Sequence, residues 1–207
     1  MLRTALASLA FGLLGWQSAA WLTQDFQVWT AEGARRLTVI DRPVHAPAAT
    51  LAGPKMTGHA LSDLLAGPGR VTIVDFVYTR CETVCSALGS EFQQLQKAIA
   101  ADPAVRLLSI SFDPTHDGAA QLQEYANRWG ADANAWRVVT VPDADELKRL
   151  LHAFQVVVIP DGLGGYEHNA ALLIVDGRGR LVRVFDYTEL DAALIYARTI
   201  AQREAAS

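Results

Sequence analysis

The sequence predicts an α/β fold of three layers, in which helices cover both faces of a central mixed sheet. After residue 70, segments typical of strands alternate with amphipathic helical segments, a pattern that places parallel strands side by side. Two more strands joined by a tight turn then precede a last helix. The 207 residues are 51 % apolar and 19 % charged, which suits one globular domain with a tail.

The alternating half opens with Val71–Tyr78, an apolar run of the length of a buried strand. The next segment, Thr83–Ala100, repeats apolar residues at helical spacing and predicts an amphipathic helix. The remaining elements expected there are strand Arg106–Phe112, helix Asp117–Trp129, strand Trp136–Val141, a helix capped by Asp143 with Glu146 completing a capping box, and a short strand or edge segment Phe154–Ile159.

The C-terminal part follows a Gly-rich loop, Asp161–Tyr166. Strands are expected at Ala170–Val175 and Arg180–Phe185, joined by the turn Asp176-Gly177-Arg178-Gly179. Thr188 and Asp191 then open a final helix. A strand, a cysteine motif at a helix start and a closing strand–strand–helix unit together predict a thioredoxin-like domain.

The first 22 residues predict either a membrane anchor or a signal peptide. Arg3 supplies a positive start, and Ala5–Leu22 is mostly apolar and, at ~1.5 Å per residue, about as long as a bilayer core is thick. The segment Ser18-Ala19-Ala20 also resembles a cleavage site. We therefore expect a single N-terminal anchor in the cell (inner) membrane, or a cleaved signal, with the rest of the chain on the periplasmic or extracytoplasmic side.

The organisation expected from these signals is an anchor or signal at residues 1–22, a stalk or linker at 23–60 and the thioredoxin-like domain at 61–207. Thr23–Leu37 could continue the anchor as a helix, whereas the prolines of Arg42–Gly58 indicate an irregular linker with short edge strands at most. Leu61–Leu65 suggests one helical turn. The net charge of -4 and the lack of a basic run argue against nucleic acid as a partner.

The two cysteines of the chain, Cys81 and Cys85, stand four apart where the first strand meets the first helix of the domain. Backbone N–H groups and the helix dipole favour thiolates at such a junction. Such a pair is suited to redox exchange, to a soft metal ion or to a structural disulfide. Two thiolates are half of a zinc site, whereas Cu(I) is satisfied by two or three ligands and fits a short set of donors better.

A third ligand would come from a histidine. His168, between the Gly-rich loop and the strand that opens the closing unit, is the first candidate, although from its position alone it could equally be an exposed loop residue. His116 is an alternative or supporting ligand; His45, His59 and His152 are expected to have no specific role. Asp113 and Asp117 follow the second strand, where ligand sites of open sheets gather. Asp113 either orients His168 and tunes the thiolates or only forms a turn, and Asp117 is expected to cap the next helix.

Three sequence blocks resemble the SCO/SenC family: V-D-F-V-Y-T-R-C-E-T-V-C, S-I-S-F-D-P-T-H-D and E-H-N-A-A-L-L-I-V-D-G-R-G-R-L-V-R, within about Val71–Ala201. Members of that family are membrane-anchored thioredoxin-like proteins that help to assemble the copper centre of cytochrome c oxidase. The resemblance implies that Cys81 and Cys85 bind copper with His168 as third ligand, and that Asp113 supports them. The chain departs from the family at Ser86 (commonly proline), Asn169 (commonly serine or threonine) and Gly118-Ala119 (commonly Thr-Pro).

The function expected from these features is that of a copper metallochaperone with a redox-active C-x-x-x-C pair. Its client would be the copper-site subunit of cytochrome c oxidase or another copper protein. The alternative is an extracytoplasmic thiol–disulfide oxidoreductase that uses Cys81 and Cys85 without metal and does not need His168.

Overall fold

A computed structural model describes residues 2–23, 25–26, 28–81 and 84–206, and the chain divides into two compact units, Met1–Thr38 and Val39–Ser207. In the first unit, α1 (Leu2–Leu22) contains a 20-residue stretch, Arg3–Leu22, with a mean hydropathy of 1.3 and no buried residue. By length and composition this helix could cross a membrane, a test that a signal sequence also passes.

The expected helical continuation through Thr23–Leu37 is wrong. The helix α1 ends at Leu22, and α2 (Ala31–Asp41) begins eight residues after Thr23. Between them Asp25 and Phe26 adopt left-handed backbone angles, with φ of 58° and 62°, which a right-handed helix cannot include.

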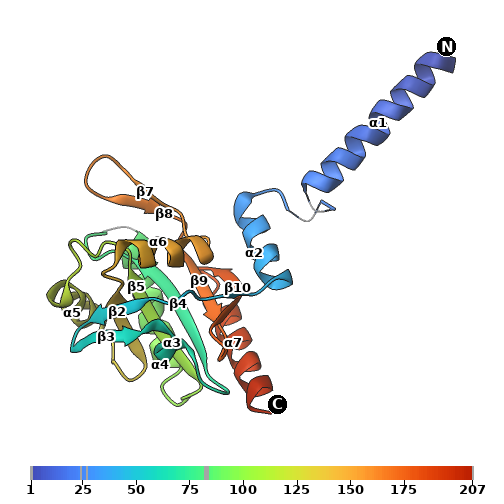
Figure 1. Cartoon of the computed structure of the whole chain (residues 1–207). Coiled ribbons are helices and arrows are strands. Elements are labelled where there is room, and N and C mark those ends of the chain that lie inside the picture. The colour runs from blue at the N-terminus through green and yellow to red at the C-terminus, as the bar shows by residue number, and fades with distance from the viewer. Residues whose placement is uncertain (1, 24, 27, 82–83, 207) are drawn as a thin grey trace. The chain divides into compact units, whose positions relative to one another are not determined.

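The second unit is built on an eight-stranded mixed sheet with the order β1-β10-β9-β4-β5-β6-β2-β3 (Figure 1). The central strands β4, β5 and β6 are parallel, while β9 runs antiparallel to β4, so the sheet is mixed as the sequence predicted. The strands are β1 (Val44–His45), β2 (Thr50–Gly53), β3 (Met56–Ala60), β4 (Val71–Val77), β5 (Val105–Ser111), β6 (Trp136–Thr140), β9 (Ala171–Val175) and β10 (Arg180–Asp186).

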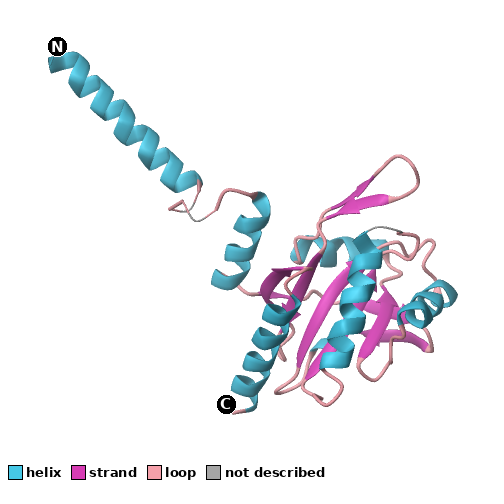
Figure 2. Ribbon diagram, turned by 180° about the vertical axis from the view of Figure 1, so that it is seen from behind, coloured by secondary structure: helices cyan, strands magenta, loops and turns pink. Residues whose placement is uncertain are grey.

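Five helices of this unit form the outer layers. They are α3 (Leu61–Leu65), α4 (Val84–Ala98), α5 (Ala119–Trp129), α6 (Ala144–Ala153) and α7 (Leu190–Ala205). Helices α3 and α6 lie on one face of the sheet, and α4, α5 and α7 on the other (Figures 1 and 2). Phe154 at the end of α6 packs edge-on against Phe76 of β4, and Phe92 of α4 packs against Trp136 of β6. The three-layer thioredoxin-like prediction is therefore confirmed.

Part of the expected linker belongs to the sheet. Strand β1 pairs with β10, and β2 and β3 form a hairpin whose residue Ala52 pairs with Thr140 of β6. Leu51 of β2 is fully buried, and the Thr50 backbone N–H donates to Glu146 Oε2 (2.7 Å). Glu146 thus holds this hairpin instead of closing the predicted capping box, although Asp143 does cap α6 by accepting from the Glu146 backbone N–H (2.8 Å).

Candidate metal centre

Cys81 lies in the loop that joins the central strand β4 to α4. Its side chain is buried, with 7 % exposure, and its backbone N–H donates to the Tyr78 carbonyl (3.2 Å). Cys85 lies in the first turn of α4, as the sequence predicted; its side chain falls outside the part of the chain that the structure describes. The cysteine motif therefore bridges the carboxyl end of a central parallel strand and a helix start, a position that favours thiolates.

The Cys81 loop is held by Asp117, which we expected to cap α5. Its fully buried carboxylate instead accepts from the Thr79 backbone N–H (2.9 Å), the Thr79 hydroxyl (2.6 Å) and the Ser111 hydroxyl. The N-cap of α5 is Gly118, which makes no side-chain capping bond. The capping prediction is wrong because Asp117 turns into the protein, toward donors on the neighbouring loop.

A second carboxylate, Asp113, holds the next residue of the same loop. Its Oδ2 accepts from Arg80 Nη2 (2.8 Å), and its Oδ1 lies 3.0 Å from His116 Nδ1 and accepts from the Thr115 hydroxyl (2.8 Å). Burial by itself would raise the pKa of Asp113, but the hydrogen bonds from His116, Arg80 and Thr115 outweigh it and hold that pKa below its ordinary value. Asp113 is therefore a carboxylate at neutral pH, and it contacts Arg80, the residue directly before Cys81.

His168 follows the Gly-rich loop, as expected, and ends a short strand. Strands β7 (Val158–Pro160) and β8 (Tyr166–His168) form a separate hairpin that extends from the layered domain (Figure 1). Val158 pairs with His168 in its register. Part of the expected loop is thus ordered as a strand, while Asp161 Oδ1 organises the tip by accepting from the backbone N–H groups of Leu163 (2.7 Å) and Gly165 (2.9 Å).

The base of this hairpin is fixed by Asn169. Its Oδ1 accepts from the Val157 backbone N–H (2.7 Å), and its Nδ2 donates to the Gln155 carbonyl (3.0 Å). A side chain that both donates and accepts can make these two bonds at once. Asn169, where the sequence departs from the resembling family, therefore contributes to positioning the residue before it, His168.

Tyr78 connects the hairpin to the cysteine-bearing loop. The Tyr78 hydroxyl donates to the Tyr166 carbonyl (3.3 Å) and accepts from the Tyr166 backbone N–H (3.2 Å). The Phe112 ring packs against Tyr78, Tyr166 and His168, with centroid distances of 5.3, 5.6 and 5.2 Å. His168 and the segment that leads to Cys81 therefore share the same aromatic neighbours, although they lie 87 residues apart in the sequence.

The environment of His168 keeps its imidazole neutral. Burial of the ring lowers the pKa of His168 to about 4, because a charged imidazolium loses its hydration there. A neutral imidazole retains a lone pair for a metal ion, and a buried cysteine supplies the soft donor that Cu(I) prefers. The described donors thus fit a Cu(I) ion.

The structure brings together some of the predicted residues and separates others. Asp113 contacts Arg80 and His116, but its described partners do not include His168. Within the described residues no three histidine, cysteine or acidic side chains form a group ready to hold a metal, and the Cys85 side chain lies outside that set. The remaining histidines, at positions 45, 59 and 152, lie in β1, β3 and α6.

Sequence reasoning missed three residues that build this region, namely Tyr78, Phe112 and Tyr166, which form the aromatic contacts. It named Asp117, which holds the loop, but gave it a capping role. Only Asp117 carried a signal, because it follows a parallel strand at the edge where ligand sites gather. The aromatic residues carried none, since their contacts depend on where the hairpin folds back.

Comparison with known proteins decides the family. The family model described as SCO1/SenC matches residues 62–202. The chain belongs to the SCO1/SenC family. The SCO1 protein homolog of Bacillus subtilis (strain 168) is 28 % identical over 124 residues, which cover 58 % of this chain and 64 % of that relative. The match thus spans less than two thirds of the relative's length.

Solved structures of SCO proteins share the fold. A SCO1/SenC family lipoprotein from Bacillus anthracis str. Ames is 20 % identical, with a TM-score of 0.68 over 78 % of this chain and 99 % of its own. BsSco is described with a disulfide switch, as a member of the Sco family of cytochrome c oxidase assembly proteins. It is 22 % identical, with a TM-score of 0.67 over 78 % of this chain and 95 % of its own. Bradyrhizobium japonicum ScoI, solved with copper bound, is 23 % identical, with a TM-score of 0.61 over 77 % of this chain and 99 % of its own. At these identities the likeness establishes the fold of this SCO1/SenC member.

Proposed function

We propose that this SCO1/SenC protein binds one copper ion through Cys81, Cys85 and His168 and delivers it to a copper protein. In our proposal the client is the copper-site subunit of cytochrome c oxidase or a related copper client. Two relatives support the proposal: ScoI, which was solved with copper bound, and BsSco, a member of the Sco family of cytochrome c oxidase assembly proteins.

One observation carries the proposal: the reciprocal hydrogen bonds between Tyr78 and Tyr166. Tyr78 precedes Cys81 by three residues, and Tyr166 precedes His168 by two. These bonds tie the strand that ends in the histidine to the segment that leads into the cysteine loop. A neutral imidazole and two thiolates arranged around one point would give Cu(I) a three-coordinate set of soft and borderline donors.

A fixed loop conformation supports the metal site. Arg80 directly precedes Cys81, and the bond from its guanidinium to Asp113 Oδ2 (2.8 Å) restrains the residue that leads into the thiol. Thiolates are the form that binds metal, and a helix start such as that of α4 favours them. Asp113 thus acts through Arg80, as a positioning residue for the cysteine loop, in place of the direct bond to His168 that the sequence suggested.

The same cysteines also account for a redox state that controls metal binding. When Cys81 and Cys85 form a disulfide, they pass two electrons and two protons to an oxidant, for example to a client disulfide that becomes two thiols. Oxidation removes two of the three ligands. We infer that reduction of the pair precedes copper binding, in line with the disulfide switch described for BsSco. We place the domain outside the cytoplasm, held at the membrane by α1.

Copper binding to the His168→Ala variant tests the proposal. Reduced, anaerobic full-length protein is expected to bind one Cu(I) per chain, and the variant about 100-fold more weakly, because a ligand is lost. Competition with a Cu(I) chelator of known affinity measures both. The matched control is His152→Ala, an exposed histidine of α6, which should bind copper like wild type. A wild-type protein that retains no copper yet reduces disulfides rapidly would instead support the metal-free oxidoreductase.

A further inference from the structure

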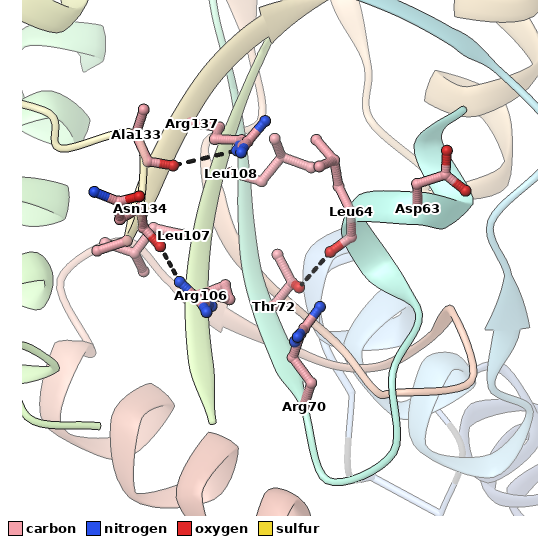
Figure 3. Close-up of a pocket in the computed structure, with 11 residues that line it drawn as sticks. Asp63, Leu64, Arg70, Thr72, Arg106, Leu107, Leu108, Ala133, Asn134 and Arg137 are labelled. Carbon is pink, nitrogen blue, oxygen red and sulfur yellow. Dashed lines mark hydrogen bonds between the residues drawn. The ribbon is translucent and has the colours of Figure 1, made fainter. Parts of the chain in front are cut away.

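A cavity of about 270 Å³ lies at the edge of the sheet opposite the cysteine loop. It is lined at the amino ends of the parallel strands, by Thr72 near the start of β4 and Arg106 near the start of β5 (Figure 3). Cys81, in contrast, follows the carboxyl end of β4. Asp63 and Leu64 of α3 complete one wall. The cavity is therefore separate from the candidate metal centre.

Three arginines, Arg70, Arg106 and Arg137, line this cavity. In the sheet register Thr72 lies beside Arg106, and Leu108 lies beside Arg137, so the side chains of these four residues project from the same face. Arg70 reaches the cavity from the loop before β4, and Figure 3 shows Arg70 and Arg106 on either side of Thr72, with Arg137 farther along the cavity beside Leu108. Segments far apart in the sequence thus supply its positive charge.

Backbone contacts orient two of these arginines without neutralising them. Arg106 Nη1 donates to the Asn134 carbonyl, Arg137 Nε donates to the Ala133 carbonyl (3.2 Å), and Arg137 Nη1 lies 3.4 Å from Met56 Sδ. No ion pair involves any of the three within the described ranges. Each guanidinium keeps further N–H donors beyond those used.

The charge around the cavity is not balanced by its own residues. Asp63 is the acidic residue among those that line it, so three guanidinium groups and one carboxylate leave a net charge of two positive. Like charges that share a cavity repel one another, and an anion with fitting geometry relieves that repulsion. The excess stands out in a chain whose net charge is -4.

We infer that this cavity binds a phosphate group with two negative charges, either as free phosphate or as a small phosphate monoester, such as the monoester headgroup of phosphatidic acid. A phosphate dianion matches the charge excess, and its oxygens accept the paired N–H donors of guanidinium groups. A monocarboxylate would leave half of the excess unbalanced. The volume accommodates a small headgroup and is too small for most drug-sized ligands, whose pockets span ~300–1,000 Å³.

Calorimetric titration of the full-length chain in nonionic detergent, at low ionic strength and without other multivalent anions, tests the inference. Inorganic phosphate is expected to bind saturably at one site per chain, and Arg70→Gln to weaken it at least about tenfold, because a charge-assisted contact is lost. The Arg70 guanidinium donates no hydrogen bond to the described residues and packs beside Gly67, so its replacement breaks no internal hydrogen bond of that group. The matched control is Arg149→Gln, an exposed arginine of α6 outside the cavity, which should leave the affinity unchanged.

A parallel titration with glycerol 3-phosphate identifies the source: tighter binding than that of inorganic phosphate supports a headgroup, and equal binding supports free phosphate. Copper binding by Arg70→Gln should equal that of wild type, which separates this inference from the proposed function. Absence of saturable phosphate binding in the wild type, or equal affinity in Arg70→Gln and Arg149→Gln, overturns it.

Discussion

Replacing Asp75 with asparagine is expected to stabilise the domain relative to wild type increasingly as the pH rises. The difference in free energy of unfolding should grow by about 1.4 kcal/mol per pH unit, or roughly 3 kcal/mol between pH 5 and pH 7.5. Chemical denaturation of both proteins across this range measures it.

The reason lies in the position of Asp75 in the middle of β4. The side chain is fully buried, and neither carboxyl oxygen has a hydrogen-bond partner within the described structure. Burial raises the pKa of Asp75 to about 8, and the nearby Ser109 hydroxyl, which already accepts from Trp136 Nε1 (2.8 Å), offsets only part of that shift. The folded protein therefore keeps a proton that an unfolded aspartate, with a pKa of about 3.9, releases.

The sign follows from this difference in bound protons. The contribution of Asp75 to stability is fully present below about pH 4 and is lost as the pH rises through about 8, where the folded carboxyl finally ionises. The burial of neutral His168 has the opposite effect on stability, because it lowers the free energy of unfolding as the pH falls below 6.5. Wild type and variant must therefore be compared at each pH. Asp145→Asn, an exposed control in α6, should show a constant difference. A constant difference for Asp75→Asn would contradict the account.

Replacing Asp117 with alanine is expected to lower the free energy of unfolding by about 3–5 kcal/mol. The substitution leaves the backbone N–H and hydroxyl of Thr79 and the hydroxyl of Ser111 without their buried acceptor. Each unsatisfied buried donor costs roughly 1–3 kcal/mol. Because Thr79 precedes Cys81 by two residues, the Cys81 thiol should also react faster with an alkylating reagent in the folded protein.

Asp143→Ala is the matched control for this prediction. Asp143 is a true helix cap, since it accepts from the Glu146 backbone N–H at the start of α6, and its loss should cost about 1 kcal/mol. Equal effects of the two substitutions, measured by denaturation, would mean that Asp117 contributes no more than a cap and that the loop does not depend on it.

Much of the sheet could be predicted because burial on both faces leaves a local trace. Strand β4 is apolar except at Thr72 and Asp75, and all seven of its residues are buried. The turn before β10 was equally local: Asp176 Oδ1 accepts from the backbone N–H groups of Arg178 (3.1 Å) and Arg180 (2.9 Å), at and just after the predicted tetrapeptide. Such signals need no knowledge of distant residues.

The edge elements were less predictable because their stability comes from distant partners. Strand β2 depends on pairing with β6 and on Glu146, nearly a hundred residues later. Strand β8 has only three residues, and it is held to the domain by the Tyr78 hydroxyl, 88 residues earlier, and by the ring of Phe112. No local pattern contains these contacts.

The candidate site divides in the same way. The cysteine pair was predictable from its position between strand and helix. The buried role of Asp117 was not predictable, because an aspartate at the start of a helix can either cap that helix or turn inward to accept hydrogen bonds. The role of Asp113 was half predicted: it lies near the cysteine loop, but its bond is to Arg80 and not to His168.

X-ray absorption spectroscopy of the Cu(I)-loaded, reduced protein tests the central proposal most directly, because it counts the atoms bound to copper. The account predicts two sulfur ligands and one imidazole nitrogen in wild type, with the imidazole signal absent in His168→Ala. A wild-type spectrum without imidazole, or one that His168→Ala leaves unchanged, would contradict the proposed copper site.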